Sequence, residues 1–220
     1  MRILLLTDSL GCPRPETSVS TTWTERILRE WSSADNVFYT YCRHGLSANM
    51  IDLNYIREIE PSIIITQFGI VDACRRALKS REMSIASSIP GIGDKIKRYC
   101  SNHHYKLSAR RNIHYCDLPH FARIVEEMTL ISNVKVYFIK ISQPGKNLIK
   151  KIYDVENDIN SYNHEVEKID NIILLDPYKD IQMDKILLND GHHLTDFGHN
   201  LVFECINNQL KIIIGEAKNV

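Results

Sequence analysis

The sequence predicts a three-layer α/β/α fold, with a doubly wound, flavodoxin-like parallel sheet of about five strands. Three observations predict it. Short aliphatic runs alternate with longer stretches of helical spacing, which is typical of parallel strands buried on both faces. The length of 220 residues suits one domain with a full core. The sequence shows no internal repeat or low-complexity tract, so we expect residues 1–220 to form a single domain.

Five apolar runs are the candidate strands. In chain order they are residues 3–6, 37–41, 63–65, 134–139 and 172–175. Each is bounded by polar or turn-forming residues, and each is too short for a helix. Together they account for the expected five-stranded sheet.

Helical patterns fill the intervals. A first helix carries Trp23, Ile27 and Trp31 at four-residue spacing. A second carries the apolar residues of 51–59, with Ser47 or Asn49 as its expected cap and Pro61 as its stop.

The second half of the chain predicts two further helices. A charged helical stretch covers about 146–168. The last helix begins at Asp196, and its expected apolar face carries Phe197, Leu201, Cys205 and Ile206.

The segment from about 77 to 119 does not fit a plain crossover connection. It is too long for one, so we expect extra helices or a lid there. Residues 75–111 contain ten Lys or Arg and two Asp or Glu. Such a basic stretch is either a solvated helical surface or a cover that attracts an anionic substrate or donor.

Composition excludes several classes of protein. The chain has 27 Lys or Arg and 27 Asp or Glu, so no net charge favours nucleic acid or an anionic membrane. Six dispersed cysteines without a C-x-x-C pair indicate free thiols in a reducing compartment. The apolar run at residues 3–6 is too short for a signal peptide, and no run could span a membrane. We therefore expect a cytoplasmic protein, and the sequence leaves its oligomeric state open.

Three short motifs follow strands or precede the last helix. Residues 7–11 read T-D-S-L-G, residues 67–72 read Q-F-G-I-V-D, and residues 189–199 read N-D-G-H-H-L-T-D-F-G-H. In a sheet of order 2-1-3-4-5, ligands bind beyond the carboxyl ends of strands 1 and 3. The first two motifs fall at that position, and the third opens toward the same edge. We expect all three to meet in one crevice.

These motifs resemble blocks of the SGNH hydrolases, also called GDSL esterases or lipases. D-S-L-G is similar to their first block, whose serine is the nucleophile, and Asp190 and His193 occupy the D-x-x-H positions of their last block. The R-H-G-L-S run at 43–47 resembles the second block, whose glycine N–H helps to form the oxyanion hole. The resemblance spans residues 7 to about 203 and is greatest to members associated with bacterial polysaccharide biosynthesis. It implies an SGNH-hydrolase-like fold.

The third block departs from the family pattern G-x-N-D. Val71 stands where the family has an oxyanion-donating Asn. The resemblance implies backbone donors at Ser9 and Gly45, with Gln67 or Asn49 as candidate substitutes for the missing amide. An oxyanion hole that lacks one donor is weaker by about 3–4 kcal/mol.

The residue types at the motifs suit acyl transfer through a serine. A base must take the proton of Ser9 as its hydroxyl attacks, and His193 is the expected base. Asp190 lies three residues before His193, close enough to fix its tautomer. His192 is the alternative base. We expect no metal, because the histidine spacing matches no known closed site.

Four further residues are weaker candidates for substrate binding. They are Asp72, Arg75, Arg76 and His192. The two arginines could pair with a carboxylate or phosphate in the crevice, or could begin a solvated helix. Asp72 could instead order the loop that follows the third strand.

Three functions are compatible with these patterns. The first is a serine ester hydrolase that removes acetyl or another small acyl group from a carbohydrate, without a cofactor. The second is an O-acyltransferase that moves an acyl group from a donor such as acetyl-CoA to a sugar hydroxyl. The third is a catalytically degenerate flavodoxin-like binding module. Each would take a small-molecule or carbohydrate ligand, anionic if the basic stretch covers the site.

Overall fold

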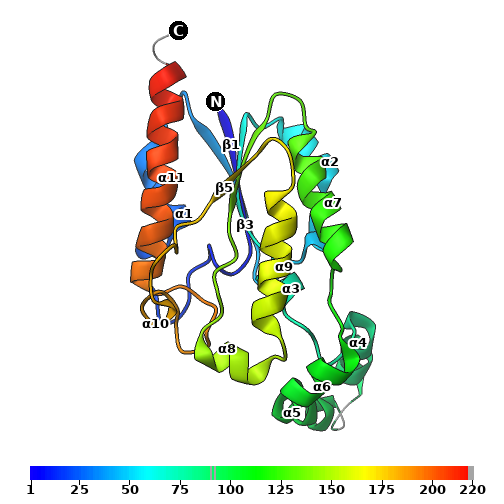
Figure 1. Ribbon diagram of the computed structural model, residues 1–220. Helices are drawn as coiled ribbons and strands as arrows, with labels where there is room; N and C mark the ends of the chain where they lie inside the picture. Colours follow the sequence, from blue (N-terminus) through cyan, green and yellow to red (C-terminus); the bar gives the residue numbers. More distant parts are fainter. Residues whose placement is uncertain (90, 92, 218–220) are drawn as a thin grey trace.

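A five-stranded parallel sheet forms the centre of the structure, with strand order β2-β1-β3-β4-β5 (Figure 1). The computed structural model describes residues 1–89, 91 and 93–217. The strands are β1 (Arg2–Thr7), β2 (Val37–Cys42), β3 (Ile63–Gln67), β4 (Lys135–Ile139) and β5 (Ile172–Leu175). The doubly wound order predicted from the sequence is confirmed.

Helices cover both faces of the sheet, which confirms the three-layer fold. The helices α1 (Trp23–Trp31) and α11 (Asp196–Ala217) pack together on one face (Figure 1). On the other face lie α2 (Leu53–Ile59), α7 (Leu118–Thr129) and α9 (Val155–Glu167). The aliphatic side chains of β1, from Ile3 to Leu6, are almost fully buried between these layers, as a central parallel strand requires.

The predicted cap of α2 is wrong. Asp52 is the N-cap, and its carboxylate accepts hydrogen bonds from the backbone N–H groups of Asn54 and Tyr55. Ser47 instead precedes a short 3₁₀ turn, η2 (Ala48–Met50). Aspartate directly before the helix satisfies two orphan N–H groups at once, so the helix begins there.

Two other helix predictions need correction. The charged stretch 146–168 is two helices, α8 (Lys146–Lys151) and α9, separated at Asp154, which adopts a left-handed φ of 59°. In α11, Phe197 is 47% exposed, whereas His199, Val202 and Ile206 are buried. Phe197 precedes His199 by two positions, which places it on the opposite side of the helix.

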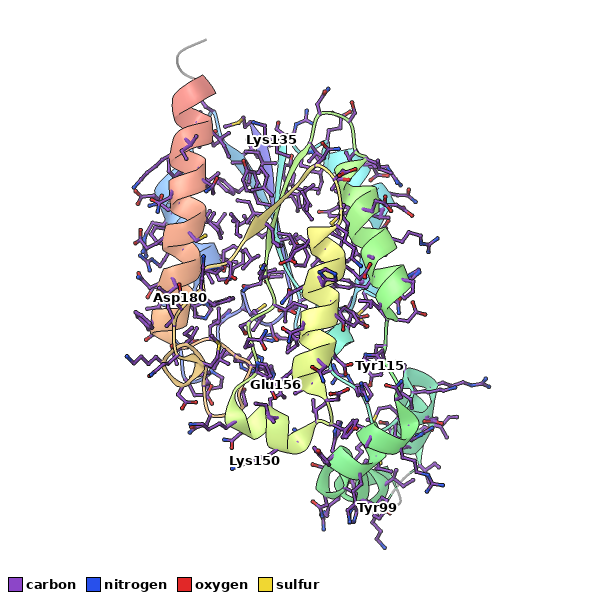
Figure 2. All side chains as sticks on the ribbon, in the orientation of Figure 1. Tyr99, Tyr115, Lys135, Lys150, Glu156 and Asp180 are labelled. Carbon is purple, nitrogen blue, oxygen red and sulfur yellow. The ribbon has the colours of Figure 1, made fainter. Side chains whose placement is uncertain are left out.

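The described residues between β3 and α7 form four helices. A short helix, α3 (Ile70–Ala73), follows β3, and α4 (Ser80–Ser88), α5 (Gly93–Asn102) and α6 (His104–Arg111) come next. The last three form a cluster beyond one end of the sheet, close to α8 (Figure 1). Figure 2 shows Tyr99 within this cluster and Tyr115 where the chain returns toward the body.

The remaining short helix, α10 (Met183–Ile186), precedes the loop that leads into α11. No helix in the described part of the chain is both long and apolar enough to cross a membrane.

Candidate active site

Ser9 lies in a tight turn at the carboxyl end of β1. The turn is closed by Oδ1 of the Asp8 carboxyl group, which accepts the backbone N–H of Leu10 at 2.9 Å, and by the Asp8 backbone carbonyl, which accepts the N–H of Gly11 at 3.3 Å. A Cβ at Gly11 would lie 2.4 Å from the Thr7 side chain, so only glycine fits here. The turn holds Ser9 at the sheet edge, where it is 8% exposed.

The loop before α11 positions His193 through Asp190. The Asp190 carboxylate accepts the backbone N–H of His192 at 3.1 Å and that of His193 at 3.0 Å. Its second oxygen lies 2.5 Å from His193 Nδ1. Gly191, with φ of +81°, packs against Leu148 of α8 so closely that a Cβ would lie 2.9 Å from the Leu148 nitrogen. Glycine is therefore required for this loop to reach the sheet edge.

Ser9 and His193 meet at this edge. His193 Nε2 lies 3.0 Å from Ser9 Oγ. An ionised carboxylate only accepts hydrogen bonds, so His193 Nδ1 carries the proton that Asp190 accepts. In the neutral imidazole, Nε2 is then the acceptor and Ser9 Oγ–H the donor. The three side chains form a continuous hydrogen-bonded chain from carboxylate to hydroxyl.

The local environment fixes the protonation of this chain. Burial raises the pKa of Asp190, but its hydrogen bonds from His193 and His192 outweigh burial and hold that pKa well below its usual range. Burial lowers the pKa of His193, and the Asp190 carboxylate opposes that shift only in part. At neutral pH the carboxylate is therefore ionised and the imidazole neutral, as a base requires.

His192 lies beside His193 and makes no contact with Ser9 within hydrogen-bond distance among the described residues. The two imidazole centroids are 4.0 Å apart, and burial lowers the pKa of His192 to about 4. Asp190, His192 and His193 present three ligand atoms within 4.8 Å of one another. Since His193 Nδ1 and Asp190 are already hydrogen-bonded to each other, a metal there would have to displace this bond.

Two backbone N–H groups of the sequence motifs have no hydrogen-bond partner among the described residues. Neither Ser9 nor Gly45 donates its backbone N–H to another described residue. Gly45, at φ +70°, follows β2, which pairs with β1 up to the Thr7–Cys42 register. Backbone N–H groups without a partner are the groups that an oxyanion could use.

The expected amide substitutes are both engaged elsewhere. Gln67 is 1% exposed; its Oε1 accepts from Trp23 Nε1 at 2.8 Å and its Nε2 donates to Tyr178 Oη at 2.6 Å. Asn49 donates its Nδ2–H to the Tyr115 carbonyl at 2.5 Å. Long-range partners thus orient both amides, and neither residue lines the cavity beside Ser9. A role for Gln67 or Asn49 as an oxyanion donor stays a prediction.

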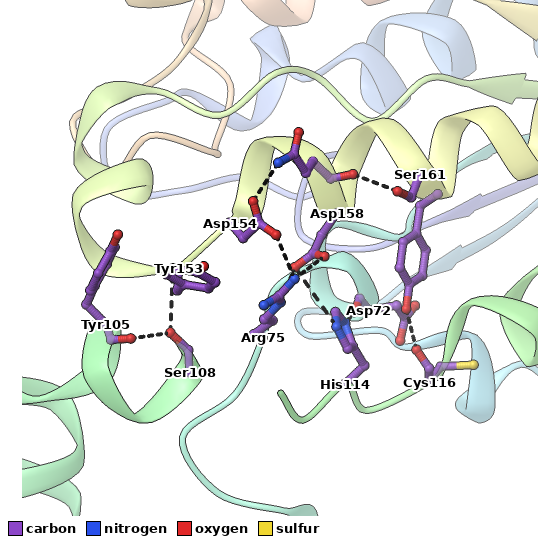
Figure 3. Close-up of polar contacts among 12 residues, drawn as sticks. Asp72, Arg75, Tyr105, Ser108, His114, Cys116, Tyr153, Asp154, Asp158 and Ser161 are labelled. Atoms are coloured by element: carbon purple, nitrogen blue, oxygen red, sulfur yellow. Dashed lines mark hydrogen bonds and ion pairs between the residues drawn. The ribbon is translucent and has the colours of Figure 1, made fainter. Parts of the chain in front are cut away.

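Two of the expected substrate-binding residues are structural. Asp72 is fully buried and accepts hydrogen bonds from the Ser47 hydroxyl and, at 3.0 Å, from the Ala48 N–H. Arg75 pairs with Asp158 at 2.7 Å and with Asp154 at 3.0 Å (Figure 3). Asp72 joins η2 to α3, and Arg75 joins the segment after α3 to α9. Neither residue lines the cavity beside Ser9, so a substrate contact by either one stays a prediction.

A cavity of about 320 Å³ opens beside Ser9. We call it the basic cavity, and its polar lining includes Ser9, Arg76, Lys97, His104, Lys151 and His192. Val71 also lines it, so the position of the missing Asn faces the space next to the serine. Of the weaker sequence candidates, Arg76 and His192 therefore lie at the site.

Sequence reasoning missed three residues of this lining. In the sequence, Lys97 is only one charge of the basic segment, and the His103–His104 pair has no spacing that indicates a site. Lys151 is the last residue of α8, and its neighbours in the sequence give no signal of a site. The packing of α5 against α6, and of α6 against α8, brings these residues to the cavity.

Comparisons with known proteins concern the fold. No family model matches the sequence, and no curated protein matches it. Solved structures do match. A lipase/acylhydrolase from Enterococcus faecalis is 17% identical over 96% of this chain and 95% of its own, with a TM-score of 0.62.

Two further structures extend the likeness. An acetyl xylan esterase from Geobacillus stearothermophilus is 13% identical over 95% of this chain and 94% of its own, with a TM-score of 0.61. A carbohydrate acetylesterase family member from Sinorhizobium meliloti is 9% identical over 97% of this chain and 99% of its own, with a TM-score of 0.59. At such low sequence identity, these matches show a similarity of fold alone. The chain has the α/β/α fold of the GDSL or SGNH lipase/acylhydrolase and carbohydrate acetylesterase structures.

Proposed function

We propose that the protein is a serine ester hydrolase that acts through an acyl-enzyme on Ser9. The observation that carries the proposal is the hydrogen-bonded chain Asp190–His193–Ser9, with 3.0 Å between His193 Nε2 and Ser9 Oγ. The acetyl xylan esterase and the carbohydrate acetylesterase among the structural neighbours favour acetyl or a small acyl group on a carbohydrate as the substrate. No step of this chemistry needs a cofactor.

The first half-reaction forms the acyl-enzyme. Ser9 Oγ attacks the ester carbonyl carbon while its proton moves to His193 Nε2. The negative charge on the carbonyl oxygen is stabilised by the N–H groups of Ser9 and Gly45. As the C–O bond breaks, the leaving alcohol takes the proton from His193.

The second half-reaction releases the acid. Water attacks the acyl carbonyl carbon and gives a proton to His193, which returns it to Ser9 Oγ as the acyl bond breaks. Asp190 stays ionised throughout and stabilises the imidazolium at each half-reaction.

The test is turnover of 4-nitrophenyl acetate by the wild-type protein and by Ser9→Ala and Ser142→Ala. Ser142 is a buried serine outside the site, so its variant controls for the loss of a buried hydroxyl. We expect Ser9→Ala to abolish turnover and Ser142→Ala to retain it. Equal turnover by wild type and Ser9→Ala would contradict the proposal.

Acyl transfer is the second candidate, because the basic cavity beside Ser9 suits a polyanionic donor such as acetyl-CoA. The acyl-enzyme would be the same, with a sugar hydroxyl in place of water. Mass spectrometry of a sugar incubated with the protein and acetyl-CoA separates the two: acetylation faster than hydrolysis supports transfer. A binding module without catalysis would show neither reaction.

A further inference from the structure

The basic cavity contains positive charge without negative charge. Arg76, Lys97 and Lys151 line it, and none of its described lining residues is Asp or Glu. Burial lowers the pKa of both His104 and His192, so at neutral pH these imidazoles neither add to nor offset the charge. The cavity is therefore positive next to the proposed nucleophile.

Arg76 differs from its neighbour Arg75 in what it pairs with. Arg75 is held by two carboxylates. Arg76 donates from Nη2 to the Val71 carbonyl at 2.7 Å and lies 4.8 Å from the centre of the Tyr115 ring. Its buried Nε has no hydrogen-bond partner, and no described carboxylate lies within ion-pair distance. The guanidinium is thus fixed in place with a donor unused.

Such an arrangement is unfavourable without a ligand. A partly buried cation loses hydration, and at Arg76 the Val71 carbonyl and the Tyr115 ring replace only part of it, since Nε has no hydrogen-bond partner. A carboxylate or phosphate would replace the rest, because the planar guanidinium presents donors that match two oxygens of either group. Lys97 and Lys151 are exposed at their positions on α5 and α8 and would add attraction from the rim.

We propose that the basic cavity binds a carboxylate or phosphate of the ester substrate while the scissile ester lies at Ser9. This inference rests on the proposed function and deepens it, because it makes the substrate an anionic ester. A volume of about 320 Å³ suits a group of the size of one sugar ring. Arg76 is the specificity-determining residue, and Lys97 and Lys151 support it.

Three acetylated probes test the charge preference. Methyl glucoside, its 6-phosphate and methyl glucuronoside, each acetylated at the same hydroxyl, share one ring and differ only at carbon 6. We expect kcat/KM to be about 10- to 100-fold higher for the charged probes than for the neutral one. Added salt should reduce this ratio, because it screens the rim lysines. Acetyl-CoA as a fourth substrate shows whether the anion belongs to an acyl donor or to the sugar.

Matched variants test which residues cause the preference for charged probes. Arg76→Gln should reduce the charged-to-neutral ratio of kcat/KM toward one, and Lys97→Ala should reduce it less. Arg98→Gln and Lys95→Ala make the same chemical changes at exposed positions of α5 outside the cavity lining. These two controls should keep the wild-type ratio.

Binding without turnover separates the two proposals. Calorimetry should show inorganic phosphate or free methyl glucuronoside binding to the wild-type protein, with a Kd at least tenfold weaker in Arg76→Gln. Binding that depends on Arg76 in a protein without Ser9-dependent hydrolysis would overturn the proposed function alone. Hydrolysis that depends on Ser9, with equal rates for all three sugars and no anion binding, would overturn the anion site alone.

Discussion

Asp190 holds His193 by two hydrogen bonds, one from the ring Nδ1–H at 2.5 Å and one from the backbone N–H at 3.0 Å. The ring is therefore fixed in orientation and tautomer by a residue of its own loop. Its other nitrogen faces Ser9, which lies 184 positions away in the chain. This relationship gives the carboxylate a positioning role that mutation can test.

Asp190→Asn should lower kcat about 10³- to 10⁴-fold with little change in KM. The neutral amide can donate to Nδ1, which favours the tautomer whose Nε2–H cannot accept the proton of Ser9. The rate of 4-nitrophenyl acetate hydrolysis measures this. Asp184→Asn, an exposed carboxylate paired with Lys146 on the surface, is the control. A loss of less than tenfold in Asp190→Asn would argue against His193 as the base.

Val71→Asn should raise kcat about tenfold or more, since one oxyanion donor contributes about 10²–10³ in rate where its geometry is ideal. Val71 lines the cavity with Ser9, and an amide there could reach an oxyanion. Val71→Leu controls for a change of size without a donor. Equal rates for the two variants would mean that the oxyanion lies elsewhere.

Arg75→Gln should destabilise the protein by about 3 kcal/mol, because it leaves Asp158 without its cation. Asp158 and Arg75 are each 13% exposed in their side chains, so water replaces the lost partner poorly. Urea unfolding of Arg75→Gln and of the exposed Arg110→Gln gives the difference. The same free energy of unfolding for both variants would mean that this ion pair contributes no stability.

The free energy of unfolding should fall as pH rises from about 6.5 to 8, and Asp8→Asn should remove part of that fall. Burial raises the pKa of Asp8 to about 8 from an ordinary value of 3.8. In this window the unfolded chain has lost the proton that the folded chain keeps, so rising pH favours unfolding, by at most about 1.4 kcal/mol per pH unit. Burial raises the pKa of Asp72 to about 6. Asp72 therefore lowers the free energy of unfolding mostly as pH rises to about 6, below the range tested here.

Urea titrations at pH 6.5 and 8 measure this slope, the change in the free energy of unfolding with pH, for wild type, Asp8→Asn and the exposed Asp170→Asn. Asp170→Asn should keep the wild-type slope. An unchanged slope in Asp8→Asn would show that the Asp8 carboxyl does not stay protonated in the folded protein.

The sheet was predictable because β1, β3 and β5 are built on continuous aliphatic runs, and several such short runs separated by helical patterns are typical of a buried parallel sheet. The convergence of Ser9 and His193 followed from strand order, since the carboxyl ends of parallel strands share an edge. Their catalytic roles stay predictions until activity is measured.

Side-chain partnerships were not predictable in the same way. Gln67 bonds Trp23 and Tyr178, which lie 44 and 111 positions away, and Arg75 bonds Asp158, 83 positions away. No local pattern encodes such pairs, so residues that looked free in the sequence are engaged in the fold. The opposite holds for Lys151, which has no feature of a site in the sequence. This surface lysine of α8 becomes part of a cavity only through the packing of the helices around it.

Trapping the acyl-enzyme tests the central claim most directly. Wild-type protein, Ser9→Ala and His193→Ala are each mixed with excess 4-nitrophenyl acetate, quenched in acid, and analysed by intact-mass and peptide mass spectrometry. We predict one added acetyl group on Ser9 in the wild type, none on that peptide in Ser9→Ala, and far slower acetylation in His193→Ala. Rapid turnover with no acetyl on Ser9, or equal acetylation with and without His193, would contradict the account.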